Sequence, residues 1–266
     1  MSPSGTALPV VPTSSNCPGC GNAVAPEALC RQLYVCDCGH HHRVDASVWT
    51  ALLPDEGTWV EQWTDLRPND LLDWKLVKSY EAQLSEAEKE GLNESVRTGT
   101  CEVAGHPVRL AVFDFRFVGG TLSRVGGERL VRSLEAAAET HTPFVLVTAS
   151  GGARMQEGLL SLMQMAKVNA AVGRLHASRT AYFSVLTDPT YGGTAASLAL
   201  LADVNLAEPG ARIGFTGPRV IKQATHADLK PDFQTSEFLL DHGQVDMVVH
   251  RHELRAAIAK LLAFHP

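Results

Sequence analysis

The amino-acid sequence predicts an α/β fold preceded by a small metal-binding unit. From about residue 96 onward, short β-type runs alternate with helical runs. Two of the strand-like runs lead into glycine pairs, Gly151-Gly152 and Gly192-Gly193. Two close pairs of cysteines, Cys17/Cys20 and Cys36/Cys38, also lie near the start of the chain. Together these features predict a metal-bound unit and an enzyme that works through backbone amides rather than through a nucleophilic triad.

Composition limits the class of protein. A chain of 266 residues is long enough for one large domain with a core, plus a small appendage. Its 45% apolar and 20% charged residues are ordinary for a soluble globular protein. The net charge of −6 gives no reason to expect nonspecific nucleic-acid binding. No apolar run approaches the ~18 residues of a membrane span, so none is expected.

Four regions follow one another along the chain. Residues 1–15 are rich in Pro and Ser and are expected to form a disordered lead. They lack the basic and apolar segments of a secretory signal, so none is expected. Cytoplasm is therefore the expected compartment. Residues 16–45 are expected to form a zinc ribbon, and residues 46–95 a linker with a charged helix over 80–91. Residues 96–266 form the predicted α/β domain.

The elements of this domain follow from the periodicity of its apolar residues. The predicted strands are 108–117, 143–148, 182–186, 204–207 and 212–215. The predicted helices are 129–140, 156–175, 194–202, 217–224, 235–241 and 252–263. The helix over 156–175 carries Leu159, Leu160, Met163, Met165 and Ala166, and this apolar content predicts that it is mostly buried.

The cysteine cluster has the pattern C-x2-C-x15-C-x-C, at Cys17, Cys20, Cys36 and Cys38. Two close pairs on two turns supply the tetrahedral sulfur ligands that zinc requires. The second pair is unusually short, so either C-x-C closes a distorted site or one of three histidines replaces a cysteine. Those histidines are His40, His41 and His42. The segment is poor in apolar residues and is expected to need a metal to fold; buried thiols without metal are the alternative.

The glycine pairs are candidate catalytic elements. A strand that ends in glycine and opens a helix leaves backbone N–H groups without partners. Gly151 and Gly152 lie in S-G-G-A-R-M-Q-E, and Gly192 and Gly193 lie in D-P-T-Y-G-G-T-A-A-S. Without a Cβ, such turns let a substrate oxygen approach the amides, which can stabilise an oxyanion. The alternative is that both are simply tight turns.

Further glycines and arginines are candidates for contacts with a phosphate or an acyl chain. Gly119-Gly120 and Gly126-Gly127 flank a short segment with Arg124 close by, which could form a loop over such a ligand or merely a flexible surface loop. Arg154 and Arg219 follow glycine-containing turns, where a cation could meet a phosphate. No G-x-S-x-G, P-loop or G-x-G-x-x-G motif is present. The substrate or cofactor is therefore expected to move the proton itself.

At this point the chain resembles a known family, the β subunit of bacterial acetyl-CoA carboxylase carboxyltransferase. The resemblance covers residues 16–264 and is densest in 149–167, 207–221 and 236–249. It implies a zinc ribbon ahead of a crotonase (ClpP)-like spiral of ββα units. It also implies an α2β2 assembly with a carboxyltransferase α subunit, working with biotin carboxyl carrier protein and an ATP-binding biotin carboxylase in fatty acid biosynthesis.

The reaction implied by the resemblance moves a carboxyl group from carboxybiotin to acetyl-CoA, giving malonyl-CoA. The biotin ureido oxygen takes the α-proton in such a reaction, which would account for the absence of a side-chain base. The residues expected to supply catalytic amides are Gly151, Gly152, Gly192 and Gly193. Those expected to contact CoA are Gly119, Gly120, Arg124, Arg154 and Arg219.

The chain departs from the family pattern at several positions. The ribbon has C-x-C where the family has C-x2-C. Tyr191 and Thr194 stand where the family usually has Thr and Val, and Ser123 and Arg124 stand where small residues are usual. These departures suit a divergent lineage or a specialised paralogue. The competing readings are a stand-alone malonyl-thioester decarboxylase and a non-enzymatic ribbon module for nucleic acid or protein, although few basic residues surround the ribbon.

Overall fold

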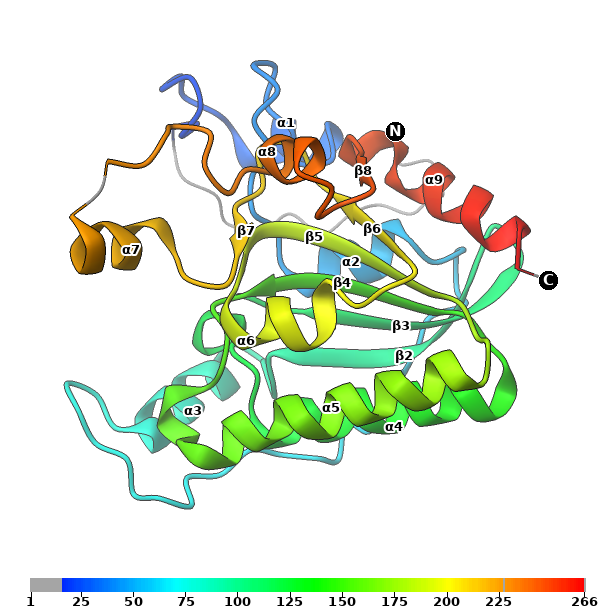
Figure 1. The fold of residues 1–266 in the computed structure, drawn as a ribbon, viewed down its shortest axis with the longest axis horizontal. Coiled ribbons are helices and arrows are strands. Elements are labelled where there is room, and N and C mark those ends of the chain that lie inside the picture. The colour runs from blue at the N-terminus through cyan, green and yellow to red at the C-terminus, as the bar shows by residue number, and fades with distance from the viewer. Residues whose placement is uncertain (1–15, 227, 266) are drawn as a thin grey trace.

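One mixed sheet organises the molecule (Figure 1). The computed structural model describes residues 16–226 and 228–265, so the predicted lead over 1–15 lies outside the described residues. The path through the sheet runs β1-β2-β3-β4-β5-β6-β8, with β7 pairing to β5. The strands are β1 Val60–Gln62, β2 Val96–Val103, β3 His106–Phe113, β4 Phe144–Ser150, β5 Tyr182–Tyr191, β6 Val204–Ala207, β7 Ile213–Gly214 and β8 Met247–Val248.

Helices cover both faces of this sheet (Figure 1). They are α1 Pro26–Arg31, α2 Ala46–Leu52, α3 Tyr80–Lys89, α4 Arg124–Thr140, α5 Leu159–Ala177, α6 Gly192–Thr194, α7 Pro218–Thr225, α8 Ser236–Asp241 and α9 Arg251–Ala263. Short 3-10 turns lie at Val118–Gly120 and Met155–Glu157, and a π-helical turn at Ala195–Ala199 continues α6.

The centre of the sheet is parallel, with an antiparallel hairpin (β2 and β3) on one side. Every residue of β4 is buried, as expected for a parallel strand with both faces covered. Because β4 and β5 are parallel neighbours, their carboxyl ends reach the same edge of the sheet. This arrangement brings the two predicted glycine turns to one place.

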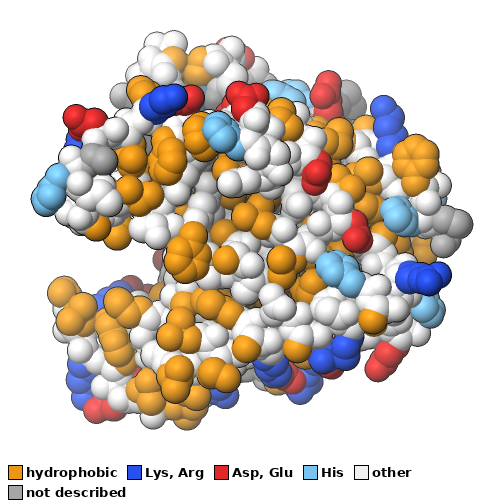
Figure 2. Space-filling view, viewed as in Figure 1, with side chains coloured by type: hydrophobic (Ala, Val, Ile, Leu, Met, Phe, Trp, Pro, Cys, Tyr) orange, Lys and Arg blue, Asp and Glu red, His pale blue; other side chains and the backbone are white. Residues whose placement is uncertain are grey.

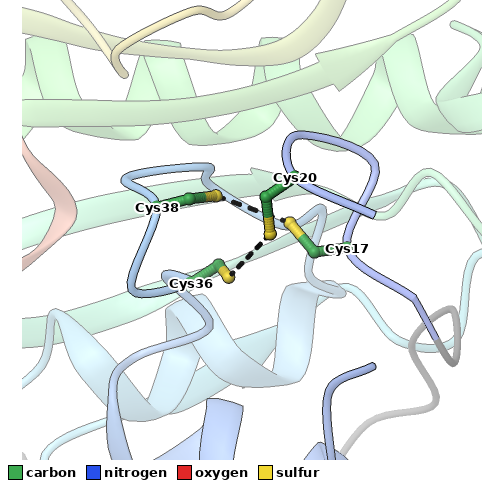
Figure 3. A group of neighbouring side chains, drawn as sticks. All are labelled: Cys17, Cys20, Cys36 and Cys38. Atoms are coloured by element: carbon green, nitrogen blue, oxygen red, sulfur yellow. Dashed lines mark hydrogen bonds between the residues drawn. The ribbon is translucent and has the colours of Figure 1, made fainter. Parts of the chain in front are cut away.

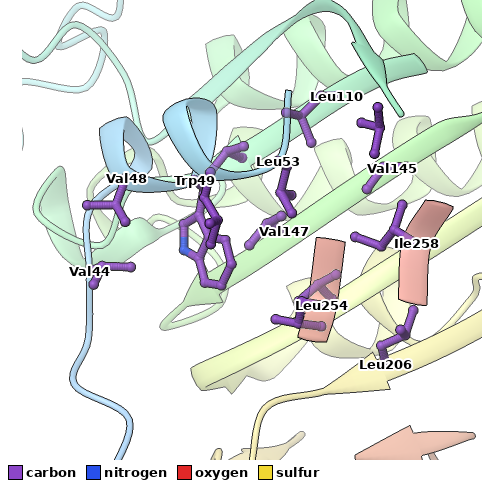
Figure 4. Packing of buried hydrophobic residues seen from close by; sticks show 14 of the residues in the cluster. Val44, Val48, Trp49, Leu53, Leu110, Val145, Val147, Leu206, Leu254 and Ile258 are labelled. Carbon is purple, nitrogen blue, oxygen red and sulfur yellow. The ribbon is translucent and has the colours of Figure 1, made fainter. Parts of the chain in front are cut away.

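The two faces of the sheet carry separate apolar cores. On one face, α4 and α5 lie side by side and bury residues such as Leu130, Leu134 and Val172. On the other face, α2 and α9 pack Trp49, Leu254 and neighbouring residues against β3, β4 and β6 (Figure 4). The predicted α/β class is therefore confirmed.

The ribbon belongs to the second core, contrary to the expectation that metal alone must hold it together. Its apolar residues pack into the same cluster as Trp49; they include Leu29, Leu33, Tyr34 and Val44. The sequence did not indicate this, because the ribbon's few apolar residues gain their partners from α2 and α9, which lie outside it in the chain.

A buried ion pair also ties the ribbon to the domain. Arg251, the first residue of α9, donates to both carboxylate oxygens of Glu208 at 2.6 and 2.7 Å. Its remaining terminal nitrogen donates to ribbon carbonyl oxygens, at 3.1 Å to Leu33 and 3.0 Å to His42. Burial by itself raises the pKa of Glu208, but the Arg251 guanidinium and a hydrogen bond with His41 outweigh burial and lower this pKa to about 2.

The start of α4 differs from the prediction. The helix begins at Arg124 rather than Arg129, so Gly126 and Gly127 lie inside it and do not form a loop over a ligand. The Ser123 hydroxyl accepts from the Gly126 N–H at 2.8 Å and caps this early start. Gly127 lies against α5, where an added Cβ would come 2.6 Å from Oε1 of Gln164. Close helix packing therefore explains this glycine.

The prediction that the helix over 156–175 is mostly buried is wrong for its first half. In α5, Leu159, Leu162 and Met163 are exposed, and Leu159 exposes 69% of its surface. Only the α5 residues that face α4 and the sheet are buried, such as Val168 and Leu175. The apolar content of α5 is therefore greater than this chain alone can bury.

Other boundaries shift less. The predicted strand over 108–117 ends at Phe113, and the strand predicted to end at Leu186 continues to Tyr191 as β5. The predicted helix over 194–202 is the short α6 followed by the π-helical turn. None of the helices in the described part of the chain has the length and apolar content needed to cross a membrane.

Candidate functional site

The two glycine turns touch each other at the carboxyl edge of the sheet. Ser150, the last residue of β4, pairs with Thr190 of β5, and the turns follow directly. Gly152 and Gly192 both have positive φ, at 106° and 66°, which favours glycine. A Cβ added at Gly192 would lie 3.0 Å from the Cα of Gly152. The backbones therefore meet with no room for a side chain between them.

Hydrogen bonding separates the four candidate amides. The Gly151 N–H donates to the carbonyl oxygen of Gly119 at 2.9 Å, and the Gly192 N–H donates to that of Phe215 at 2.9 Å. The Gly152 N–H donates to Oγ of Ser150 at 3.1 Å. Gly193 is the second residue of α6, where a helix offers no internal acceptor. Within residues 16–226 and 228–265, its N–H has no recorded acceptor.

This pattern distinguishes the four glycines that were expected to supply catalytic amides. Three of the amides already have protein acceptors, so they shape and hold the turns. Gly193 is the one of the four whose N–H has no protein acceptor among the described residues. The sequence could not separate the four because the acceptors Gly119 and Phe215 come from other parts of the chain.

Met165 of α5 covers one side of Gly193. A Cβ added at Gly193 would overlap both Cε and Sδ of the Met165 side chain. Met165 is only partly buried and packs at the margin of the core formed with α4. The sequence identified Met165 as an apolar helix residue but contained no signal for its contact with the second glycine turn.

The space-filling view shows a hollow at one side of the molecule (Figure 2), where Figure 1 places α7 on one side and the segment that contains α3 on the other. Figure 2 shows hydrophobic side chains on both sides of this hollow. α7 has no buried residue, and Phe215 and Val220 on that side are exposed. Exposed apolar residues also lie in the segment before α3, and in the 3-10 turn and the first turns of α5. They are Leu71, Leu72, Leu76 and Val77 in the first segment, and Met155, Leu159, Leu162 and Met163 in the second.

The loop with Gly119 and Gly120 lies against the end of β4. A Cβ added at Gly120 would overlap the carbonyl oxygen of Ala149, and both glycines have positive φ. The Gly119 carbonyl accepts from Gly151, so this loop borders the first glycine turn. Arg124 follows it, and its guanidinium donates to Oδ1 of Asn69 at 2.6 Å.

Arg154 is buried, whereas Arg219 is exposed on α7. The Arg154 side chain is 0% exposed and pairs with Glu94 at 2.8 Å. It also donates to the Tyr80 hydroxyl at 3.0 Å and to the carbonyl oxygen of Thr121 at 2.6 Å. Burial raises the pKa of Glu94, but Arg154 and the hydrogen bonds to Glu94 lower it overall. The Arg154 guanidinium is therefore occupied by these buried partners, which does not fit the expected contact with CoA.

The four predicted cysteine ligands come together (Figure 3). Their sulfur atoms all lie within 4.8 Å of one another, with Cys17 and Cys38 3.7 Å apart and Cys20 and Cys36 4.0 Å apart. The Cys17 sulfur also accepts from the Gly19 N–H at 3.4 Å. None of the neighbouring histidines belongs to this group among the described residues. The C-x-C pair therefore supplies two thiols to a group that can hold a metal ion.

The close approach of the four thiols also favours binding of a cation, because their thiolate forms would repel one another. A backbone hydrogen bond from His40 lowers the pKa of Cys38, but burial and the other cysteine sulfurs outweigh it and raise this pKa to about 12. Burial also raises the pKa of Cys17, yet hydrogen bonds from the Cys20 and Gly19 backbone lower it to about 7. Four thiolates can share this space only if a positive ion offsets their repulsion.

The fold and the glycine turns define a carboxyl transferase domain, and that family matches residues 74–266. The structure is similar to transcarboxylase 12S, solved with hydrolysed methylmalonyl-coenzyme A, with a TM-score of 0.66 and 27% identity. That match covers 80% of this chain and 40% of the transcarboxylase chain. It is also similar to a malonate decarboxylase heterodimer of Pseudomonas, with a TM-score of 0.63, 26% identity and coverage of 84% and 86%.

Sequence relatives identify the family of carboxyl transferases to which the chain belongs. The chain is 47% identical over 253 residues to the acetyl-coenzyme A carboxylase carboxyl transferase subunit beta of Microcystis aeruginosa, covering 94% of this chain and 80% of the relative. The subunit of the same name from Synechococcus sp. CC9311 is 46% identical, with coverage of 94% and 87%. The chain belongs to the family of acetyl-coenzyme A carboxylase carboxyl transferase beta subunits, and its class of activity is carboxyl transfer.

Proposed function

We propose that this chain, together with a homologous α subunit, transfers the carboxyl group of carboxybiotin to acetyl-CoA to give malonyl-CoA. The observation that carries the proposal is the Gly193 N–H, which has no recorded acceptor in the described chain and lies where two glycine turns meet. An enolate or ureido oxygen could accept a hydrogen bond there. The names of the sequence relatives support acetyl-coenzyme A and carboxyl transfer, and carboxybiotin as the donor follows from the family resemblance.

The reaction needs few side chains. Cleavage of the N–carboxyl bond of carboxybiotin releases CO2 and leaves a ureido anion, which takes the α-proton of acetyl-CoA. The enolate carbon then bonds to CO2. The described atoms closest to an added Cβ at Gly152 or Gly193 belong to backbone or to Met165, none of which titrates. The protein's part is thus to donate the Gly193 N–H, to orient the two substrates and to exclude water.

CoA is proposed to lie along the loop that contains Gly119 and Gly120, with Arg124 and Arg219 as cationic contacts. The loop borders the first glycine turn, and an added Cβ at Gly119 would meet no described atom within 4 Å, which leaves room there for a pantetheine chain. Arg154 is left out of this set because its guanidinium is buried. The other two arginines remain candidates for the CoA phosphates.

The exposed apolar side chains on the two sides of the hollow favour binding of a partner subunit. Monomeric proteins rarely expose contiguous apolar patches larger than a few hundred Å². Here the start of α5 and the segment before α3 expose several Leu and Met side chains, while α7 has no buried residue. We propose that a carboxyltransferase α subunit covers these residues in an α2β2 assembly and closes the hollow. Biotin carboxyl carrier protein and biotin carboxylase complete the proposed cytoplasmic complex.

Zinc is the proposed ion at Cys17, Cys20, Cys36 and Cys38. Four thiolates around one centre suit the tetrahedral preference of structural zinc. The ion would hold the two cysteine turns together. No catalytic step is assigned to it.

Metal analysis should find about one zinc per chain. We expect Cys36→Ser to lower the zinc content at least tenfold, because it removes one of the four sulfur ligands. Cys30→Ala is the matched control, since Cys30 lies outside the group, and it should keep the metal. Equal zinc content in both variants would contradict the assigned ligands.

The first test of function is exchange between malonyl-CoA and biocytin. It should be run on the chain alone and on the chain co-expressed with a carboxyltransferase α subunit. Activity only in the mixture supports the proposal. Turnover of malonyl-CoA by the chain alone would favour the decarboxylase alternative, and no activity in either sample would indicate a paralogue that has lost catalysis.

A further inference from the structure

We infer that Thr194 is a positioning residue whose buried hydroxyl links the two glycine turns by hydrogen bonds. This inference rests on the proposed function, since it concerns the amide of the neighbouring Gly193. Thr194 is fully buried and lies in α6, whereas Ser150 ends β4 and is also fully buried. A hydrogen bond of 3.0 Å joins their side-chain oxygens.

The bond belongs to a closed chain that starts and ends at Gly152. The Gly152 N–H donates to Oγ of Ser150 at 3.1 Å, and the Ser150 hydroxyl donates to Oγ1 of Thr194 at 3.0 Å. The Thr194 hydroxyl then donates to the Gly152 carbonyl oxygen, over a longer 3.4 Å. Each hydroxyl both accepts and donates, so the three bonds polarise one another in the same sense.

The chain of bonds acts across the contact of the two turns. The backbones of Gly152 and Gly192 are in contact with each other. The buried Thr194 hydroxyl links the first turn to the residue next to Gly193. The spacing between the turns is thus held by both contacts, which keeps the Gly193 N–H in a constant place relative to the first turn.

The family usually has valine at this position, so the hydroxyl of Thr194, rather than its shape, is what distinguishes this chain. Valine has almost the same volume but can neither accept from Ser150 nor donate to Gly152. After Thr194→Val, the buried Ser150 hydroxyl would lose its acceptor, and a buried polar group without a partner is costly. Ser150 would then reorient, and its bond from the Gly152 N–H would weaken. Thr194 touches no substrate, because it has no exposed surface.

The test compares Thr194→Val with Thr194→Ser and with a control, Thr98→Val. Thr98 is also fully buried, but its hydroxyl has no partner among the described residues. We expect Thr194→Val to lower kcat of the assembled α/β complex about fivefold in malonyl-CoA–biocytin exchange, with KM for malonyl-CoA within about twofold, because a displaced donor weakens the transition state more than substrate binding. Thr194→Ser and Thr98→Val should keep the wild-type kcat.

Amide hydrogen exchange provides a readout that does not depend on activity. In Thr194→Val, exchange in a peptide spanning Ser150 to Ala153 should rise at least threefold, whereas Thr98→Val should leave it unchanged. Wild-type exchange in Thr194→Val would overturn the inference, as would a wild-type kcat. If the wild-type complex has no transfer activity, the proposed function fails, and the hydrogen-exchange comparison alone decides the role of Thr194.

Discussion

Gly193→Val should lower the rate of carboxyl transfer by at least about a hundredfold, the usual loss when one oxyanion donor is removed. The Cβ of the new side chain would overlap Met165, and its branches would crowd the space around the Gly193 N–H. The rate is measured as malonyl-CoA–biocytin exchange in the assembled complex. Zinc content and the circular dichroism spectrum should stay unchanged, because the affected contact lies with a flexible methionine at the surface of the core.

Two further variants show how Gly193 acts. Gly173→Ala serves as the control, because Gly173 lies in α5 and an added Cβ there meets no other atom within 4 Å. Gly193→Ala combined with Met165→Ala removes the overlap and separates packing from donation. Recovery of full activity in that double variant would show that packing alone caused the loss. Wild-type turnover in Gly193→Val would remove Gly193 from the mechanism.

Arg251→Met should destabilise the protein by about 3–5 kcal/mol, the usual loss when one partner of a buried ion pair is removed. The substitution leaves the buried Glu208 carboxylate without its cation and deprives the Leu33 and His42 carbonyl oxygens of a donor. The free energy of unfolding is measured by chemical denaturation. Limited proteolysis should then cut the ribbon first, because Arg251 joins the ribbon to α9.

An exposed ion pair provides the comparison. Arg132→Met removes the surface pair with Glu128, four residues earlier in α4, and should cost no more than about 1 kcal/mol. Arg251→Lys keeps a charge but loses the two-pronged geometry, so it should lie between the two. A loss below about 1 kcal/mol for Arg251→Met would show that the ribbon is held by its apolar contacts alone.

The sequence was most informative where the signal was local. Alternating strands and helices predicted the α/β class, and the strand over 204–207 was confirmed without change. Boundaries failed where a distant contact decides them. The helix of Arg124–Thr140 begins five residues earlier than predicted, because Ser123 caps it and α5 accepts its glycines at close range.

The candidate site divides in the same way. Spacing predicted the four cysteines, whose sulfur atoms do gather, but could not decide whether a histidine replaces one of them. Arg154 was predicted to contact a ligand because it follows a glycine turn in the chain. Its partner Glu94 lies 60 residues away in sequence and could not be identified from the local pattern.

The sequence by itself determined the class of fold, the cysteine group, and the two glycine turns on which the proposed chemistry depends. These features depend on residue type and on the spacing of residues close together in the sequence, so the sequence alone can predict them. Only the tertiary structure decided that the Gly193 amide has no acceptor in the part of the chain that it describes, that Met165 contacts this glycine, and that Arg251 binds the ribbon. Each of these facts depends on atoms from segments far apart in the chain, which meet only when parallel strands end at the same edge of the sheet.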